Sequence, residues 1–186
     1  MMRTLGTTLL AVAVVTATLV AQQPAGNPIT DSIKRQHGIA KDYLTRSAAM
    51  LDEKDYTFKP AGVAAEVRNF GQLLGHIANA QYMLCGGAIG ISTGGAERGP
   101  GGMDYEKLTT KAELQKALND SFAVCDKAFT QVNDKNAGEA VTGLPIGPTT
   151  KLGALSFNVA HNFEHYGNIV TYLRVKGLVP PSSQKK

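Results

Sequence analysis

Apolar side chains return every three or four positions along four stretches of this chain, which is the spacing of one face of an α-helix. The helices that this spacing predicts cover residues 30–51, 69–88, 110–132 and 150–176. In the first helix, the apolar stripe consists of Ile33, Ile39, Tyr43 and Leu44. In the second, it consists of Phe70, Leu73, Leu74, Ile77 and Leu84. The third continues the pattern through Leu114, Leu118, Phe122, Cys125 and Phe129.

Residues that cap or stop helices occur at the ends of these stretches. Thr30 or Asp31 is a suitable N-cap for the first helix. Thr110-x-x-Glu113 is a capping-box pattern at the start of the third helix. Gly177 follows the fourth helix, at the position where a glycine commonly ends a helix. These signals support the same four helices as the apolar spacing.

The connection between the second and third helices is long and rich in glycine, with eight glycines in residues 86–108. An antiparallel helix pair needs only a short connection. This length therefore favours a crossover between two parallel helices, and a flexible lid is the alternative interpretation. With four helices and no strand pattern, the sequence predicts an all-α four-helix bundle.

The N-terminal residues have the layout of a secretory signal peptide. A short basic start at residues 1–4 precedes an uncharged apolar stretch at 5–20, and the chain then turns polar. The expected division of the chain is a signal peptide at 1–21, cleaved near Ala17 or Ala21, a short linker at 22–30 and the bundle domain at 31–183. The protein would then be exported, either periplasmic or secreted, without a stable membrane anchor. An uncleaved anchor is the alternative, because flanking residues can extend an apolar stretch of this length.

The charge balance bears on the expected partners. The chain has 19 Lys and Arg against 15 Asp and Glu, a formal net charge of +4, and its basic residues are scattered along the helices. Binding to nucleic acid requires a clustered basic patch, so we expect no nucleic-acid partner. A small molecule of unidentified class is the expected substrate or ligand, and a homodimer is compatible with the sequence.

Cys85 and Cys125 are the two cysteines of the chain. In an exported protein an even number of cysteines usually pairs. A disulfide between them would close a loop of about 40 residues, which stabilises the fold by about 4 kcal/mol in the chain-entropy model. Two separate buried thiols are the alternative, and the spacing fits neither a CxxC redox pair nor a zinc ribbon.

Two of the four histidines lie four residues apart in the fourth expected helix. His161 and His165 therefore share one helical face, and they fall on a stripe that also contains Phe157, Ile169 and Tyr172. Two imidazoles on one face can bind the same metal ion. A pair of core histidines held by hydrogen bonds is the alternative interpretation.

The segment His161-x-x-Glu164-His165 also matches the inverzincin pattern, in which two histidines bind zinc and the glutamate acts as general base. Those proteases take their third ligand from downstream, but residues 166–186 contain no Asp, Glu, His or Cys. The protease hypothesis therefore fails, and a third ligand has to come from upstream. Glu164 and His37 are weak candidates for acid–base chemistry, and His37 is more simply a surface or hydrogen-bonded residue.

The best upstream candidate for a third ligand is His76, which borders the apolar face of the second helix. Three histidines from two facing helices leave coordination positions open, as catalytic metal sites do and structural ones do not. Zinc or nickel suits such a set of nitrogen donors. A di-iron centre would require Glu-x-x-His pairs, which the chain lacks.

Several segments resemble those of the DinB-like (DinB/YfiT superfamily) proteins. The second expected helix begins with a similar motif, Phe70-Gly71-Gln72-Leu73-Leu74-Gly75-His76, and the segment before it resembles theirs in Asp55-Tyr56-x-Phe58-x-Pro60. The last helix is similar in His161-x3-His165-Tyr166-Gly167-Asn168 and in Tyr172-Leu173-Arg174-x2-Gly177-x2-Pro180-Pro181. The resemblance implies a bundle of up-down-down-up topology with the second and third helices parallel. It also implies a divalent metal ion, zinc or nickel, held by His76, His161 and His165.

The resemblance implies less about the reaction. Relatives include thiol transferases and metal hydrolases, so the expected activity is that of a metal-dependent hydrolase or transferase with an unidentified substrate. An exported protein fits a thiol transferase poorly, because low-molecular-weight thiols are mainly cytosolic. The alternatives are a non-catalytic exported module that holds metal or a small ligand, and a domain whose histidines only pack. The candidate pocket-lining residues are Tyr82, Tyr166 and Tyr172, for which core packing is the alternative role.

Overall fold

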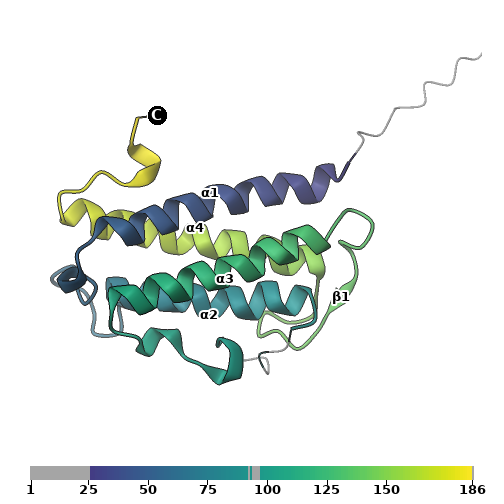
Figure 1. Ribbon diagram of the computed structural model, residues 1–186, viewed down its shortest axis with the longest axis horizontal. Helices are drawn as coiled ribbons and strands as arrows, with labels where there is room; N and C mark the ends of the chain where they lie inside the picture. Colours follow the sequence, from purple (N-terminus) through teal and green to yellow (C-terminus); the bar gives the residue numbers. More distant parts are fainter. Residues whose placement is uncertain (1–25, 92, 94–96, 186) are drawn as a thin grey trace, which may run out of the picture.

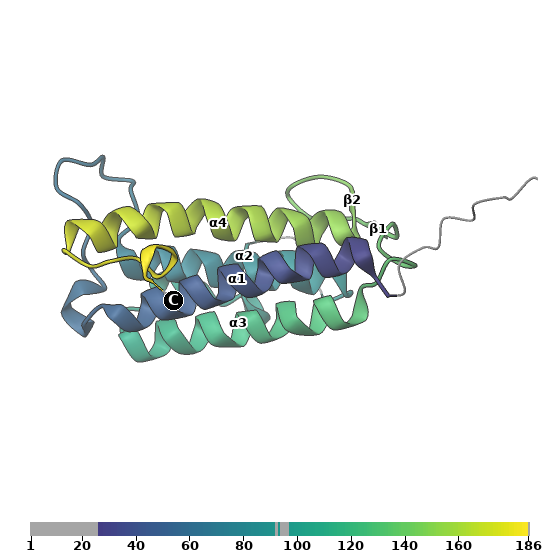
Figure 2. The ribbon, with the colours of Figure 1, turned by 90° about the horizontal axis from the view of Figure 1, so that it is seen from above.

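The computed structural model describes residues 26–91, 93 and 97–185, and these form a bundle of four long helices (Figures 1 and 2). The helices are α1 (Pro28–Met50), α2 (Phe70–Ala88), α3 (Lys111–Gln131) and α4 (Lys151–Val175). Short 3₁₀ turns lie outside them: η1 (Glu53–Asp55), η2 (Pro100–Gly102), η3 (Tyr105–Lys107) and η4 (Pro181–Ser183). The expected signal peptide at 1–21 lies outside the described residues. Among the described helices, none is long and apolar enough to cross a membrane.

Helices α2 and α3 run in the same direction, and α1 and α4 run in the opposite one (Figure 1). Near the start of the parallel pair Leu114 packs against Gly71, and near its end Cys85 is bonded to Cys125. The connection from α2 to α3 therefore returns along the length of the bundle, along the outer side of α2 (Figure 1). The predicted all-α bundle is confirmed, and the long glycine-rich segment acts as the crossover.

Helix α2 is buried on nearly every side, with 17 of its 19 residues buried. It packs against α3, against α4 and against the crossover around η3. Its start is held by a reciprocal pair of hydrogen bonds between Asn69 and Gln72, a capping box. The crossover approaches closely at Gly75, where a Cβ atom would lie 2.3 Å from the carbonyl oxygen of Tyr105. Only a residue without a side chain fits there.

The main hydrophobic core fills the part of the bundle nearest to the α1–α2 connection. Phe70 and Phe122 are among its largest fully buried side chains, and burying such a side chain stabilises the fold by roughly 1.5–3 kcal/mol. Leu73 and Ile169 belong to the same core, on the helices that carry the candidate histidines. The core thereby sets the spacing between α2 and α4.

Helix α1 begins at Pro28, inside the stretch expected to be a linker, and neither Thr30 nor Asp31 is its N-cap. Its early backbone N–H groups, those of Ile29 and Thr30, instead donate to the carboxylate of Asp134 at 3.1 and 2.8 Å. Asp134 lies in the connection between α3 and α4. A contact between segments so distant in the sequence replaces the local cap, and for this reason the capping pattern predicted the wrong start.

Two residues assigned to apolar stripes lie on the outside of the bundle. Ile39 and Phe157 are each 46% exposed. Each neighbours a fully buried residue, Ala40 and Asn158 respectively. One position along a helix is a rotation of about 100°, which is enough to turn a side chain from the core to solvent. The expected inward orientation of Ile39 and Phe157 is therefore wrong.

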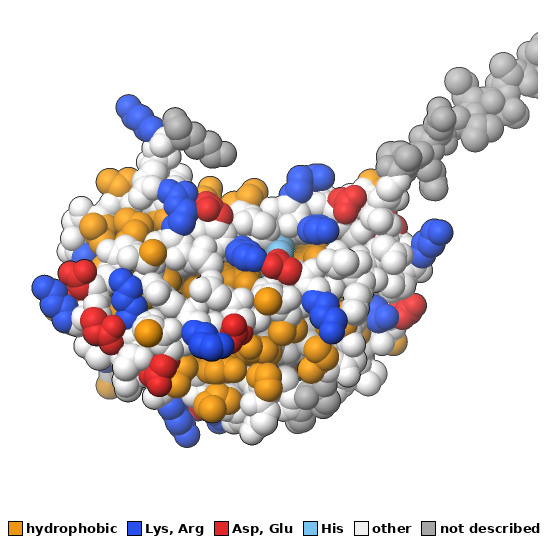
Figure 3. All heavy atoms as spheres, viewed as in Figure 1, with side chains coloured by type: hydrophobic (Ala, Val, Ile, Leu, Met, Phe, Trp, Pro, Cys, Tyr) orange, Lys and Arg blue, Asp and Glu red, His pale blue; other side chains and the backbone are white. Residues whose placement is uncertain are grey.

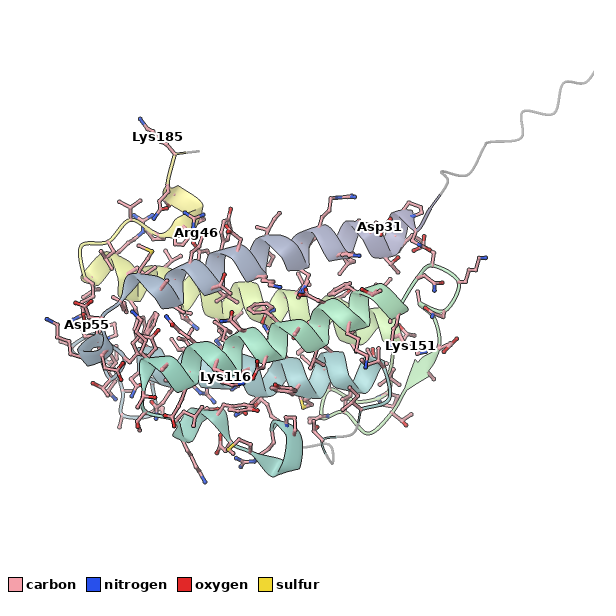
Figure 4. All side chains as sticks on the ribbon, viewed as in Figure 1. Asp31, Arg46, Asp55, Lys116, Lys151 and Lys185 are labelled. Carbon is pink, nitrogen blue, oxygen red and sulfur yellow. A yellow bond between two sulfur atoms is a disulfide. The ribbon has the colours of Figure 1, made fainter. Side chains whose placement is uncertain are left out.

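A short strand pair and two ion pairs stabilise the segments that connect the helices. β1 (Ala140–Val141) and β2 (Thr149–Thr150) pair antiparallel in the α3–α4 connection, where two-residue strands leave no pattern in the sequence. Lys151 pairs with Glu139 and Lys176 with Asp55, each at 2.6 Å. Figure 4 labels Lys151 and Asp55, which lie at opposite ends of the bundle. On the face seen in Figure 3, basic side chains are interspersed with acidic ones.

Removal of the Cys85–Cys125 disulfide is expected to destabilise the fold by about 4 kcal/mol, because the bond closes a loop between residues separated by 40 positions. The measurement is guanidinium unfolding of the variant with Cys85→Ala and Cys125→Ala, compared with the wild type with and without a reductant. An unfolding midpoint unchanged by both the substitution and the reductant would contradict the expectation.

Candidate metal centre

Three of the four histidines meet between α2 and α4: His76 from α2, and His161 and His165 from α4. The Nε2 atom of His161 lies 3.2 Å from Nε2 of His76 and 3.0 Å from Nε2 of His165. Donor atoms of the three lie within 4.8 Å of one another. Nitrogens at 2.0–2.1 Å from a tetrahedral zinc ion are about 3.4 Å apart. The spacing therefore suits a single ion bound by all three rings.

Burial keeps two of these rings neutral. Desolvation, together with a smaller effect of the neighbouring His165 and His76, lowers the pKa of His161 to about 3. Desolvation also lowers the pKa of His165 to about 4, while the carboxylate of Glu106 acts in the opposite direction. A metal ion binds the neutral form of imidazole. At neutral pH both rings of α4 are therefore ready to act as ligands.

Groups on the far side of the rings hold the histidines in orientation. Nδ1 of His76 lies 3.1 Å from Oε1 of Glu106, and the guanidinium of Arg68 donates to the same carboxylate at 2.8 and 3.3 Å. An ionised carboxylate only accepts, so Nδ1 of His76 carries the hydrogen and Nε2 presents its lone pair to the cluster. Nδ1 of His165 contacts the amide of Asn168 at 3.3 Å. Amide oxygen and nitrogen are exchanged by a flip, so this amide can accept the corresponding hydrogen.

The donor chemistry of the cluster fits a cation. Within the part of the chain that the structure describes, Nδ1 of His161 is buried without a hydrogen-bond partner. A neutral ring whose hydrogen is on Nδ1, such as His76, offers only a lone pair at Nε2. Hydrogen bonds among the three rings therefore cannot satisfy all three Nε2 atoms. Lone pairs facing each other at about 3 Å repel, and a cation between them replaces that repulsion by coordination.

The crossover brings acidic side chains to this cluster. The side chain of Asn79 on α2 donates to Asp104 and accepts from the backbone N–H of Tyr105, both at 3.1 Å. The close approach at Gly75 lies in the same place. These contacts fix η3 against α2, and Glu106 of η3 consequently reaches the histidines.

Sequence reasoning did not identify Glu106, Arg68 or Glu97 as site residues. Glu97 also belongs to the crossover, and its carboxylate oxygens lie 3.6 Å from Nδ1 of His76 and 3.9 Å from Nε2 of His161. The one local signal was Gly75, beside a candidate ligand, since a helical glycine often marks a close backbone approach. That signal shows where another segment passes and does not identify the segment.

A cavity of about 270 Å³ adjoins the cluster on the side of His165. Its walls come from the segment before α2, from α2 and from α4, and consist of Glu66, Val67, Arg68, Leu73, His165, Asn168 and Tyr172. The hydroxyl of Tyr172 donates to the carbonyl oxygen of Arg68 at 2.5 Å. Burial raises the pKa of Tyr172, so this hydroxyl keeps its proton and fixes the wall of the cavity.

The two weak candidates for acid–base chemistry lie away from the cluster. Glu164 is exposed on α4. His37 is buried between α1 and α3, where its Nε2 lies 2.8 Å from Asp126 and its ring stacks on Phe129. Burial lowers the pKa of His37, and Asp126 acts in the opposite direction. His37 is therefore a hydrogen-bonded core residue and not a surface residue.

The three candidate pocket tyrosines have different environments. Tyr82 stacks on Tyr105 of the crossover. Tyr166 donates its hydroxyl to Ser182 at 2.8 Å and so holds the C-terminal segment. Tyr172 lines the cavity beside His165.

Comparisons with known proteins agree on the fold. A protein-family model described as the DinB superfamily matches residues 38–169. A DinB-like protein from Bacillus cereus ATCC 10987 has a similar structure, with 16% identity, a TM-score of 0.64 and coverage of 81% of this chain and 95% of that one. A conserved protein from Enterococcus faecalis has 14% identity, a TM-score of 0.61 and coverage of 79% and 96%.

A mycothiol-dependent maleylpyruvate isomerase also shares the fold, with 14% identity, a TM-score of 0.59 and coverage of 75% of this chain. The match spans only 60% of the isomerase chain. No curated protein matches this sequence. Identities this low establish a common fold and leave the chemistry to be argued from the site.

The metal-free protein is expected to lose stability as the pH falls from 6.5 to 5. The folded-state pKa values of His161 and His165 lie below the unfolded value of 6.5, so the unfolded chain binds more protons throughout this window. Each histidine contributes a slope of up to about 1.4 kcal/mol per pH unit. The measurement is denaturant unfolding of chelator-treated protein across this window. A variant with His161→Gln and His165→Gln should show a flatter profile, and equal slopes for the two proteins would contradict the assignment.

Proposed function

This chain belongs to the DinB superfamily, and on that premise we propose that it binds one divalent metal ion, zinc or nickel, through His76, His161 and His165. The observation that carries the proposal is the convergence of three Nε2 atoms from two helices. Three protein ligands leave coordination positions free. We therefore propose a metal-dependent hydrolase or transferase that acts on a small molecule.

A bound divalent ion would lower the pKa of a coordinated water or thiol and polarise an electrophile. The chain's own groups prepare this centre. Glu106 orients His76 and adds negative charge beside it, while Arg68 holds that carboxylate in place. Burial keeps His161 and His165 unprotonated at neutral pH, so protons do not compete with a metal ion for their ring nitrogens.

The cavity beside His165 is the proposed place for a substrate. Its volume of about 270 Å³ is slightly below the roughly 300–1,000 Å³ of pockets that hold drug-sized ligands. Its lining includes the charged residues Arg68 and Glu66 and the polar residue Asn168, beside the apolar Val67 and Leu73. The small volume and the charged residues in the lining favour a small substrate with a polar group over a large apolar one.

We also propose that the protein is exported. The support is the leader-like composition of residues 1–21 together with the Cys85–Cys125 disulfide in the bundle, since disulfides persist in oxidising compartments. In such a compartment a hydrolytic reaction requires no cytosolic thiol as cosubstrate.

Metal stoichiometry tests the proposed function. Purified full-length protein is stripped with a chelator, dialysed against zinc or nickel, and analysed for bound metal. The expected result is one ion per chain, lost in the variant with His161→Gln and His165→Gln and retained in Glu164→Gln, since Glu164 is exposed. A wild-type protein that binds neither metal would overturn the proposal.

Turnover then distinguishes an enzyme from a binding module. The metal-loaded protein is assayed against panels of esters, amides and thiol adducts. Activity that is lost with a chelator and restored by the metal supports catalysis. Tight metal binding without turnover favours the non-catalytic module instead.

Glu106→Gln is expected to weaken metal binding by about 10- to 100-fold, because a carboxylate that orients a histidine ligand also raises its basicity. The measurement is competition of the variant with a chromophoric chelator. The matched control is Glu139→Gln. It also removes an ion-paired carboxylate, but one that pairs with Lys151 in the connection between α3 and α4. Equal affinities for Glu106→Gln and the wild type would show that Glu106 does not support the centre.

A further inference from the structure

Glu97 lies over the histidine cluster without belonging to either helix that forms it. Oε2 is 3.6 Å from Nδ1 of His76 and Oε1 is 3.9 Å from Nε2 of His161. The carboxylate thus extends across two rings that come from α2 and α4. Its side chain is 37% exposed, whereas that of His161 is 12% exposed. Glu97 therefore lies on the solvent side of the cluster.

The contact with His76 does not explain this position. A separation of 3.6 Å exceeds the range of a side-chain hydrogen bond. Nδ1 of His76 already has Glu106 at 3.1 Å as its acceptor. A ring nitrogen has one hydrogen to donate, so the nearer carboxylate of Glu106 is the partner of Nδ1.

The oxygen that faces Nε2 of His161 has a different role open to it. Donor atoms around one ion bound at 2.0–2.1 Å are about 3.4 Å apart, and the separation of 3.9 Å between Oε1 and Nε2 is roughly half an ångström longer. Rotation of a glutamate side chain closes such a gap. Carboxylate oxygen is an ordinary ligand of zinc, alongside imidazole nitrogen.

The backbone that carries Glu97 is anchored on its C-terminal side. Arg98 forms an ion pair with Asp104, and the N–H of Gly99 donates to the carbonyl oxygen of Met103 at 2.8 Å. Asp104 is in turn bound by Asn79 of α2. These contacts fix the backbone next to Glu97 beside the cluster, and rotation about the side-chain bonds of Glu97 can still move its carboxylate.

We propose that Glu97 is a fourth, displaceable ligand of the metal centre, which closes the site until a substrate donor replaces it. This inference rests on the proposed metal site at the three histidines. Three neutral imidazoles leave a divalent ion with its full charge of +2, and Glu97 reduces the charge of the centre to +1. A ligand that displaces the carboxylate with little loss has to be an anionic donor, such as a carboxylate or a thiolate.

Cobalt(II) substitution tests this role directly, because its visible absorption reports coordination number and ligand type. Full-length wild-type protein, Glu97→Gln and Glu164→Gln are stripped of metal and titrated with cobalt(II), and each is then titrated with azide as a simple anionic donor. Glu164→Gln is the matched control, because it removes the same charge from an exposed residue that is adjacent to His165 in sequence only.

The expected result is that Glu97→Gln alone changes the cobalt spectrum, weakens cobalt binding by at least about tenfold and binds azide more tightly than the wild type. A Glu97→Gln protein with the wild-type spectrum, cobalt affinity and azide affinity would overturn the role of Glu97 and leave the three-histidine centre intact. Failure of the wild type to bind cobalt at all would overturn the metal centre and this inference together.

Discussion

Helix α2 is enclosed on nearly all sides, and this enclosure determines how the neighbouring helices and the crossover are placed. α3 and α4 cover two sides of the helix and the crossover covers another, so that 17 of its 19 residues are buried. A histidine on such a helix has little access to bulk water, and His76 is only 7% exposed. His76 has to find polar partners inside the protein, and α4 and the crossover provide them.

The crossover can approach His76 only because residue 75 of α2 is a glycine. At Gly75 the backbone of Tyr105 passes so close to α2 that a Cβ atom would overlap it. This approach brings η3 against the helix and Glu106 against His76. Because α2 and α3 are parallel, they require a long connection, and this connection supplies the carboxylates of the site. The nitrogen donors come from the antiparallel helices α2 and α4.

Periodicity and helix spacing were sufficient to predict the bundle and the pairing of His161 with His165. His76 was chosen from its place beside the apolar face of the second helix, and the resemblance over the start of that helix then supported the choice. Glu106 and Glu97 could not be predicted, because their positions depend on how an irregular, glycine-rich segment folds back on α2. Ile39 and Phe157 were misplaced for a different reason. Apolar type alone does not distinguish two helical positions that differ by about 100°, and packing against neighbouring helices decides between them.

The proposed metal centre consists of one ion held by three imidazoles between α2 and α4. X-ray absorption at the metal edge of the purified, metal-loaded protein tests it most directly, because imidazole rings produce a characteristic scattering pattern. We expect about three imidazole nitrogens at 2.0–2.1 Å, together with one or more oxygen ligands. A spectrum with no imidazole scattering, or one that is unchanged when His76 is replaced by Gln, would contradict it.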